Sequence, residues 1–380
     1  MNMTQCSTAE KIESSAIALF SQRWYSSVSV AEICREAKLS NGIFYKYFQN
    51  KEILIRHILE GVINRIALAL SAMSGNDAQE RIRSMTDILV RFAAEHKDLI
   101  TVFREGQYRY FEYEHRLAEL YKRSLAQALG RSVSLAEYLY AIGGIRFAAV
   151  RAALHGTQVS LGAIEDMLIN GIFKGLRWDE AKVFGITVSQ PDITLDEGSR
   201  VRLMNAGKKL FGSRGFHEVN IHELTDAAGL SVGAFYKHFE SKEAFFGELI
   251  DEAGKQVRHF ITINLSPGLN RLERELQGIY LFGVFLSLDR WCYNIVREGE
   301  FVAPARVRAY YAAFEHGYDK LGDEGLDPIF NAADPLYRAS SVEFLLGISH
   351  YYGIELLFDG FRGSAKAVVG SIAKYLSEGL

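Results

Sequence analysis

Residues 40–54 read SNGIFYKYFQNKEIL, and residues 231–245 read SVGAFYKHFESKEAF. Eight of these fifteen positions are identical, and no gap is needed. The offset of 191 residues (231 minus 40) persists upstream, where Leu19-Phe20 matches Leu210-Phe211. Solenoid repeats have periods of only about 20–50 residues. The sequence therefore predicts two whole domains of one kind, fused in tandem.

The duplication extends beyond this motif. The segment FREG at 103–106 parallels VREG at 296–299, and both copies end on Gly-Leu, at 175–176 and 379–380. We therefore expect each copy to consist of the motif followed by a longer second part.

Composition restricts the class of protein. The chain has 380 residues, five prolines and a formal net charge of −3. The length allows two or three domains, and any DNA binding must depend on local basic patches, because the overall charge is slightly negative. Few prolines and repeated helical spacing of apolar residues predict an all-α fold.

Neither a metal site nor a cofactor is expected. Cys6, Cys34 and Cys292 are odd in number and lack CxxC spacing, which argues against a disulfide framework and a zinc site. No apolar signal segment is visible at the N-terminus, and the apolar stretch 279–288 is shorter than the roughly 20 residues that span a bilayer. We expect a cytoplasmic protein without a membrane partner. No constellation of catalytic residues is found, so we expect no enzyme.

Each copy follows the order helix, turn, short helix, turn, longer helix. Residues 29–32 (SVAE) and 220–223 (NIHE) are predicted to form capping boxes. In each box the first side chain accepts a hydrogen bond from the N3 backbone N–H, and the Glu side chain accepts one from the N-cap backbone N–H. Caps of the later helices are expected at Ser40, Ser231, Asn50 and Ser241. This order of elements is a helix-turn-helix, whose second helix enters the DNA major groove.

The two motifs resemble the DNA-binding domain of TetR/AcrR-type transcriptional regulators. The resemblance rests on AEICREAKLSNGIFYKYFQNKEIL at 31–54 and ELTDAAGLSVGAFYKHFESKEAFF at 223–246. In the first copy it implies DNA contacts from Ser29, Ser40, Asn41, Gly42, Tyr45, Lys46, Tyr47 and Lys51. In the second copy it implies DNA contacts from Asn220, Ser231, Val232, Gly233, Tyr236, Lys237, His238 and Lys242.

The resemblance also implies roles for these residues. Tyr47 and His238 would read bases, and Lys51 and Lys242 would hold a phosphate at a helix N-terminus. The core that fixes the recognition helix would consist of Phe44, Phe48, Phe235 and Phe239.

The first copy departs from the family pattern at two positions. Trp24 replaces a glycine that the second copy keeps as Gly215, and Lys38 occupies the turn position of Gly229. We expect Lys38 to adopt a positive φ at some cost in free energy.

Aromatic residues cluster in the second part of each copy. Tyrosines and phenylalanines recur at 108–121 and 301–318. They indicate either helix packing or a pocket for an apolar or aromatic small molecule, with arginine or tyrosine as polar handles. The candidate ligand-binding residues are Arg104, Tyr108, Phe111, Tyr121, Arg297, Phe301, Tyr311 and Tyr318.

The resemblance predicts a pseudo-dimer within one chain. Members of the family pair two C-terminal helices from each of two subunits. Residues 135–155 and 161–175 would here pack against residues 340–359 and 364–377, with Gly143 and Gly144 permitting close approach. The predicted DNA-binding domains are residues 7–56 and 198–247. The predicted helical regulatory domains are residues 57–177 and 248–380, and residues 178–197 form a linker.

The function expected from this architecture is that of a ligand-responsive repressor. As a monomer or weak dimer, it would bind an imperfectly palindromic double-stranded operator. The alternative is a helical ligand-sensing or protein-interaction scaffold whose helix-turn-helix modules no longer bind DNA.

Overall fold

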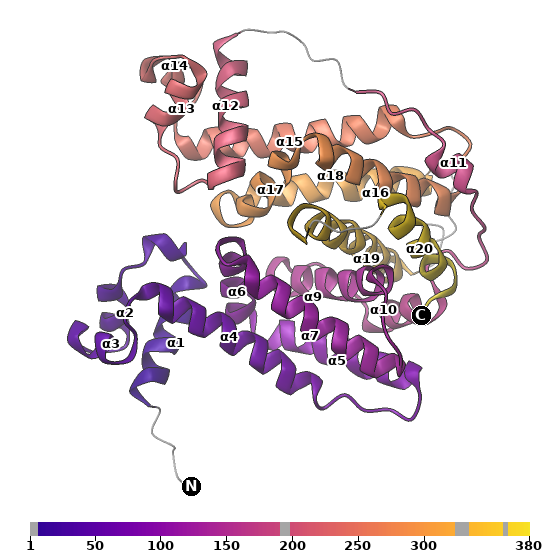
Figure 1. Ribbon diagram of the computed structural model, residues 1–380, viewed down its shortest axis with the longest axis horizontal. Coiled ribbons are helices and arrows are strands. Elements are labelled where there is room, and N and C mark those ends of the chain that lie inside the picture. The colour runs from indigo at the N-terminus through magenta and orange to yellow at the C-terminus, as the bar shows by residue number, and fades with distance from the viewer. Residues whose placement is uncertain (1–6, 191–197, 324–333, 360–363) are drawn as a thin grey trace. The chain divides into compact units, whose positions relative to one another are not determined.

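The computed structural model describes residues 7–190, 198–323, 334–359 and 364–380, and all regular structure within them is helical (Figure 1). The chain divides into two compact units, residues 1–133 with 149–157 and residues 134–148 with 158–380. No helix in the described ranges combines the length and hydropathy needed to cross a membrane.

The first unit begins with the first motif. Ile12, Ala16 and Phe20 of its first helix are buried, as their spacing predicts. Its helices are α1 (Thr8–Phe20), α2 (Val30–Glu36), α3 (Asn41–Tyr47), α4 (Lys51–Leu70), α5 (Ala78–Glu95), α6 (Lys97–Arg109) and α7 (Phe111–Leu129). Helix α4 is the long element that continues from the motif into the rest of the unit, where it contacts α5, α6 and α7.

The second unit contains the second motif and the end of the first copy. Its first-copy elements are α8 (Leu135–Tyr138), a π-helical turn (Leu139–Gly143), the start of α9 (Gly144–His155), α10 (Leu161–Asn170) and α11 (Glu180–Phe184). Its motif consists of α12 (Ser199–Arg214), α13 (Ile221–Ala228) and α14 (Val232–Tyr236). The remaining helices are α15 (Lys242–Asn264), α16 (Arg271–Leu288), α17 (Arg290–Val302), α18 (Pro304–Asp323), α19 (Pro335–Ile354) and α20 (Ala365–Glu378).

Helices from the two copies pack together inside the second unit. The turn at 139–143 and α10 contact α19, while α8 and α10 contact α20. A Cβ on Gly347 would come within 2.4 Å of the Gly143 carbonyl oxygen, and one on Gly144 within 2.4 Å of the Phe344 ring. The predicted close approach at Gly143 and Gly144 is therefore present. The last helices of the first copy therefore belong to the same compact unit as the second copy, and the boundary between the units does not coincide with the boundary between the copies.

Part of the predicted linker is packed structure. Helix α11 lies against α16, where the rings of Phe184 and Tyr280 have centroids 5.2 Å apart. Gln277 Nε2 donates to the carbonyls of Lys182 and Val183 at 3.1 and 3.0 Å. Residues 178–190 are thus held by side chains far away in sequence, while residues 191–197 of the predicted linker lie outside the described residues.

Candidate DNA-binding and ligand-binding sites

The first helix-turn-helix is formed by α2 and α3. The capping box at Ser29 and Glu32 is present, as predicted, and Asn50 caps α4 by accepting the Ile53 N–H. Ser40 precedes α3 without a side-chain capping bond, so its predicted capping role is wrong. Lys38 has the predicted positive φ of 57° and is the non-glycine residue with this conformation among the described ones.

The second helix-turn-helix repeats this geometry with more favourable residues. Asn220 and Glu223 form the predicted capping box, and both Ser231 and Ser241 cap their helices. Gly229 supplies the left-handed turn residue, with φ 63°. A glycine adopts this conformation without steric cost, whereas Lys38 does not.

The recognition helices present polar and aromatic side chains to solvent. Tyr45, Tyr47 and Tyr236 are 58, 50 and 55% exposed, whereas Phe44 and Phe235 beside them are fully buried. This alternation anchors each short helix by one face and leaves the other free. Ser29, Ser40, Asn41, Gly42, Lys46, Asn220, Ser231, Gly233, Lys237 and His238 are also exposed, and Val232 is half-buried. His238 Nε2 lies 2.7 Å from the Ser199 hydroxyl of α12.

Lys51 and Lys242 make equivalent contacts in the two modules. Lys51 Nζ donates to the carbonyls of Tyr25 and Val28 at 2.8 and 2.6 Å. Lys242 Nζ donates to those of Phe216 and Val219, both at 3.0 Å. Burial lowers the pKa of both amines. Two of the three ammonium donors thus hold the segment after the first helix, and one remains for another acceptor.

A carboxylate from the helices that follow each module contacts the same segment. Glu105 of α6 accepts the Tyr25 N–H at 2.6 Å, and Glu298 of α17 accepts the Phe216 N–H at 2.9 and 2.8 Å. Burial raises the pKa of Glu105 to about 7, although Arg109 and Lys51 oppose this shift. Each helix-turn-helix module is therefore tied to a later helix of the same unit, α6 in the first copy and α17 in the second.

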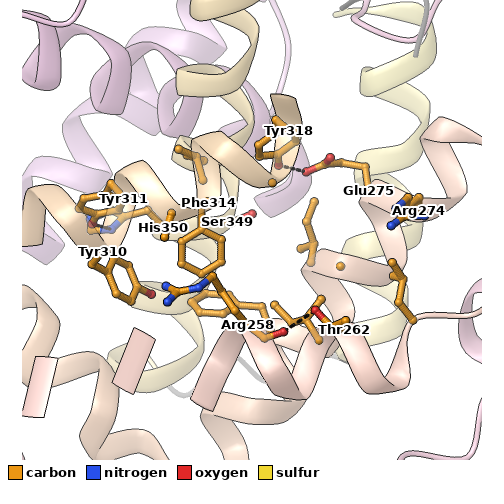
Figure 2. A pocket seen from close by; sticks show the side chains of 18 of the residues that line it. Arg258, Thr262, Arg274, Glu275, Tyr310, Tyr311, Phe314, Tyr318, Ser349 and His350 are labelled. Carbon is orange, nitrogen blue, oxygen red and sulfur yellow. Dashed lines mark hydrogen bonds between the residues drawn. The ribbon is translucent and has the colours of Figure 1, made fainter. Parts of the chain in front are cut away.

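The second unit contains a cavity of about 460 Å³, which we call the α15–α18 cavity. Residues of α15, α16, α17, α18, α19 and the loop 265–267 line it, as Figure 2 shows from close by. Its volume lies in the range of small-molecule sites. Tyr293, Tyr311 and His350 are buried, whereas Thr262 and Pro267 are exposed, which gives the cavity a closed and an open side.

Polar groups of the cavity are partly committed to one another. Tyr318 donates to Glu275 at 2.8 Å, and Arg271 forms an ion pair with Glu275 at 2.8 Å. The Tyr293 hydroxyl donates to the His350 carbonyl at 2.7 Å. The apolar wall includes Ile261, Leu265, Ile279, Phe282, Phe314 and Leu346. Such a cavity fits a largely apolar small molecule that carries few polar groups.

Two predicted ligand residues, Tyr311 and Tyr318, line this cavity. The other six, Arg104, Tyr108, Phe111, Tyr121, Arg297 and Phe301, do not. Arg297 is only 1% exposed. Arg258, Phe282 and His350, which come from α15, α16 and α19, also line the cavity and were not predicted from the sequence. In the sequence, the feature that could have pointed to Arg258 is its position as a charged residue between the apolar residues Val257 and Phe260.

Two modules with buried phenylalanine anchors and exposed second helices have the geometry of helix-turn-helix domains. Residues 12–58 and 203–249 each match the family described as bacterial regulatory proteins, tetR family. The chain therefore carries two DNA-binding domains of the tetR family in tandem.

Relatives of the chain include transcriptional regulators. It is 29% identical over 198 residues to the uncharacterized HTH-type transcriptional regulator YuxN of Bacillus subtilis (strain 168), covering 48% of this chain and 66% of YuxN. It is 33% identical over 90 residues to the HTH-type transcriptional repressor DhaR of Mycobacterium sp. (strain GP1), covering 24% of this chain and 45% of DhaR. The chain thus spans between about half and two thirds of the length of these relatives.

A solved structure with similarity is that of FadR from Bacillus subtilis in complex with stearoyl-CoA. The sequence identity is 14%, the coverage is 47% of this chain and 98% of that chain, and the TM-score is 0.41.

Proposed function

We propose that the protein is a DNA-binding transcriptional regulator, acting as a repressor, whose affinity for its operator responds to a small molecule. The observation that carries this proposal is the paired exposure of Tyr45 and Tyr236 on recognition helices whose phenylalanines are buried. The relatives of the chain include the HTH-type transcriptional repressor DhaR. The protein would act in the cytoplasm, where its operator lies.

The modules would read unlike half-sites. Asn41 and Tyr47 of the first module correspond to Val232 and His238 of the second. The two modules would therefore present different hydrogen-bonding and apolar groups to the base edges. Lys46 and Lys237 are free to contact phosphates, and Lys51 and Lys242 each retain one ammonium donor for this purpose. One chain would therefore cover an imperfect palindrome, with half-site centres about 34–36 Å apart or a multiple of this spacing.

The effector would occupy the α15–α18 cavity. Its wall is mostly apolar, with Tyr311 and Tyr318 as polar handles. Glu298 on the neighbouring helix α17 contacts the second module through Phe216, which offers a route from cavity to DNA-binding domain. The domain boundaries predicted from the sequence remain part of this proposal.

Selection of bound sites from a random DNA pool tests the proposal. We expect an imperfectly palindromic consensus whose two halves differ, and binding that weakens steeply with salt because lysine–phosphate contacts release counterions. Failure to enrich any site at low salt would favour the alternative of a scaffold with degenerate modules.

A further inference from the structure

The charges around the α15–α18 cavity do not balance. Its lining contains Arg258, Arg271 and Arg274 but the single carboxylate Glu275. Arg271 is paired with Glu275 at 2.8 Å. Among the described residues, no carboxylate lies within ion-pair distance of Arg258 or Arg274. The cavity therefore has an excess of positive charge.

Arg258 is the more enclosed of these two arginines. Its Nη1 atom is buried without a hydrogen-bond partner, and its guanidinium carbon lies 5.6 Å from the centroid of the Phe314 ring. Figure 2 shows the guanidinium between Tyr310 and Phe314, across the cavity from Arg274. Burial lowers the pKa of Arg258, which reflects the cost of enclosing its charge.

Asp251, on the same helix, offsets the burial of Arg258 only in part. Its carboxylate forms an ion pair with Arg306, not with Arg258. A buried charge without a partner is destabilising, and a well-placed anion with hydrogen bonds to it offsets part of that penalty. Tyr310, beside the guanidinium, keeps its hydroxyl protonated because burial raises its pKa. This hydroxyl can donate to the same anion.

We propose that the cavity binds an amphipathic organic carboxylate, whose charged group meets Arg258 and Tyr310 and whose apolar body lies along Ile279, Phe282 and Leu346. This inference rests on the proposed effector function of the cavity and adds the charge of the ligand to it. An arginine recognises a carboxylate through charge-assisted hydrogen bonds, which a neutral isostere cannot make. A cavity of about 460 Å³ suits an acyl or aryl body of moderate size.

Calorimetric titration of the full chain with matched pairs of probes tests this inference. The pairs are decanoate with 1-decanol and 2-naphthoate with 2-naphthamide. We expect at least one carboxylate to bind about 10- to 100-fold more tightly than its neutral partner. The Arg258→Met variant should lose this preference while retaining the weak affinity for the neutral probe.

Two variants serve as controls. Arg308→Met removes an exposed arginine of α18 that does not line the cavity, and it should bind both probes like the native chain. Arg258→Lys retains the charge and should keep part of the preference. Because Arg258 has an unsatisfied buried nitrogen, Arg258→Met should melt at the native temperature or above. Melting curves will confirm that a loss of binding is not a loss of fold.

Three results would overturn the inference: equal affinity for both members of each pair, unchanged carboxylate binding by Arg258→Met, or no binding of either carboxylate. DNA binding is measured separately, by gel shift with the selected operator. If a carboxylate binds through Arg258 but operator affinity does not change, the ligand class stands and the proposed effector role fails.

Discussion

The carboxylate of Glu298 accepts the backbone N–H of Phe216 with both of its oxygens, at 2.9 and 2.8 Å. The equivalent pair in the first copy is Glu105 and Tyr25, at 2.6 Å. In each copy the contacted residue follows the first helix of the DNA-binding module, and its carbonyl accepts from the lysine that begins α4 or α15. This contact joins the helical part that follows each module directly to that module.

Glu105 should make stability depend on pH. Its folded pKa of about 7 exceeds the ordinary value, so the folded state binds more protons than the unfolded state. Stability should be unaffected below pH ~4.5, fall as pH rises towards 7, and stay reduced above it. Glu105→Gln keeps the acceptor for Tyr25 and should be more stable than the native chain by about 1–3 kcal/mol at pH 8, with little difference at pH 4.5.

Urea denaturation at both pH values measures this difference. Glu36→Gln, an exposed position on α2, is the control and should follow the native curve. An equal gain for Glu105→Gln at both pH values would show that ionisation of Glu105 is not the cause.

Lysines at the start of α4 and α15 should contribute to the salt dependence of DNA binding. Lys51→Ala and Lys242→Ala should each weaken binding to all sequences and reduce the slope of log affinity against log salt by about 1. Each change also removes two bonds to backbone carbonyls, so melting curves must first show a folded protein. A native slope in folded Lys242→Ala would exclude Lys242 from the phosphate contacts.

The turn residues of the two modules should respond in opposite directions. Lys38→Gly should raise the free energy of unfolding by about 1 kcal/mol, because a left-handed conformation disfavours residues with a Cβ. Gly229→Ala should lower it, since the added Cβ would also lie 2.5 Å from Arg202 Nη2. Lys38→Ala separates the effect of φ from that of charge and should give no gain. Denaturant titration of the three variants decides between these outcomes.

Close helix contact at Gly347 should be sensitive to a single methyl group. Gly347→Ala would bring Cβ within 2.4 Å of the Gly143 carbonyl oxygen, and it should destabilise the second unit by about 1–3 kcal/mol. Gly278→Ala has no atom within 4 Å of the added Cβ. It should instead be neutral or stabilising, because alanine favours the helix. Equal melting temperatures for the two variants would argue against tight packing at this crossing.

Pairing of the two copies within one chain should make the intact protein a monomer or a weak dimer. The first-copy residues Ile142 and Ile145 and the second-copy residues Phe344 and Ile348 are all fully buried. Each such side chain contributes roughly 1.5–3 kcal/mol. Residues 1–180 alone would expose this face and should self-associate or aggregate. Light scattering on both chains tests this; an obligate dimer of the full chain with a well-behaved monomeric half would contradict it.

Sequence alone determined the duplication, the all-helical class, the two helix-turn-helix modules and most of their caps. These features are local: a cap, a turn residue or a buried phenylalanine depends on neighbours three or four positions away. Even the strained turn at Lys38 could be predicted, because the second copy shows glycine there.

Tertiary structure alone decided the roles of residues whose partners lie far away in the sequence. The α15–α18 cavity combines α15, α16, α17, α18 and α19, so aromatic spacing within one segment identified Tyr311 and Tyr318 but not Arg258 or His350. Residues 178–190 pack because Gln277 and Tyr280 supply partners some ninety residues later. Lys51 and Lys242 look like simple phosphate ligands in the sequence. Only the folded chain brings the carbonyls of Tyr25 and Phe216 to their ammonium groups.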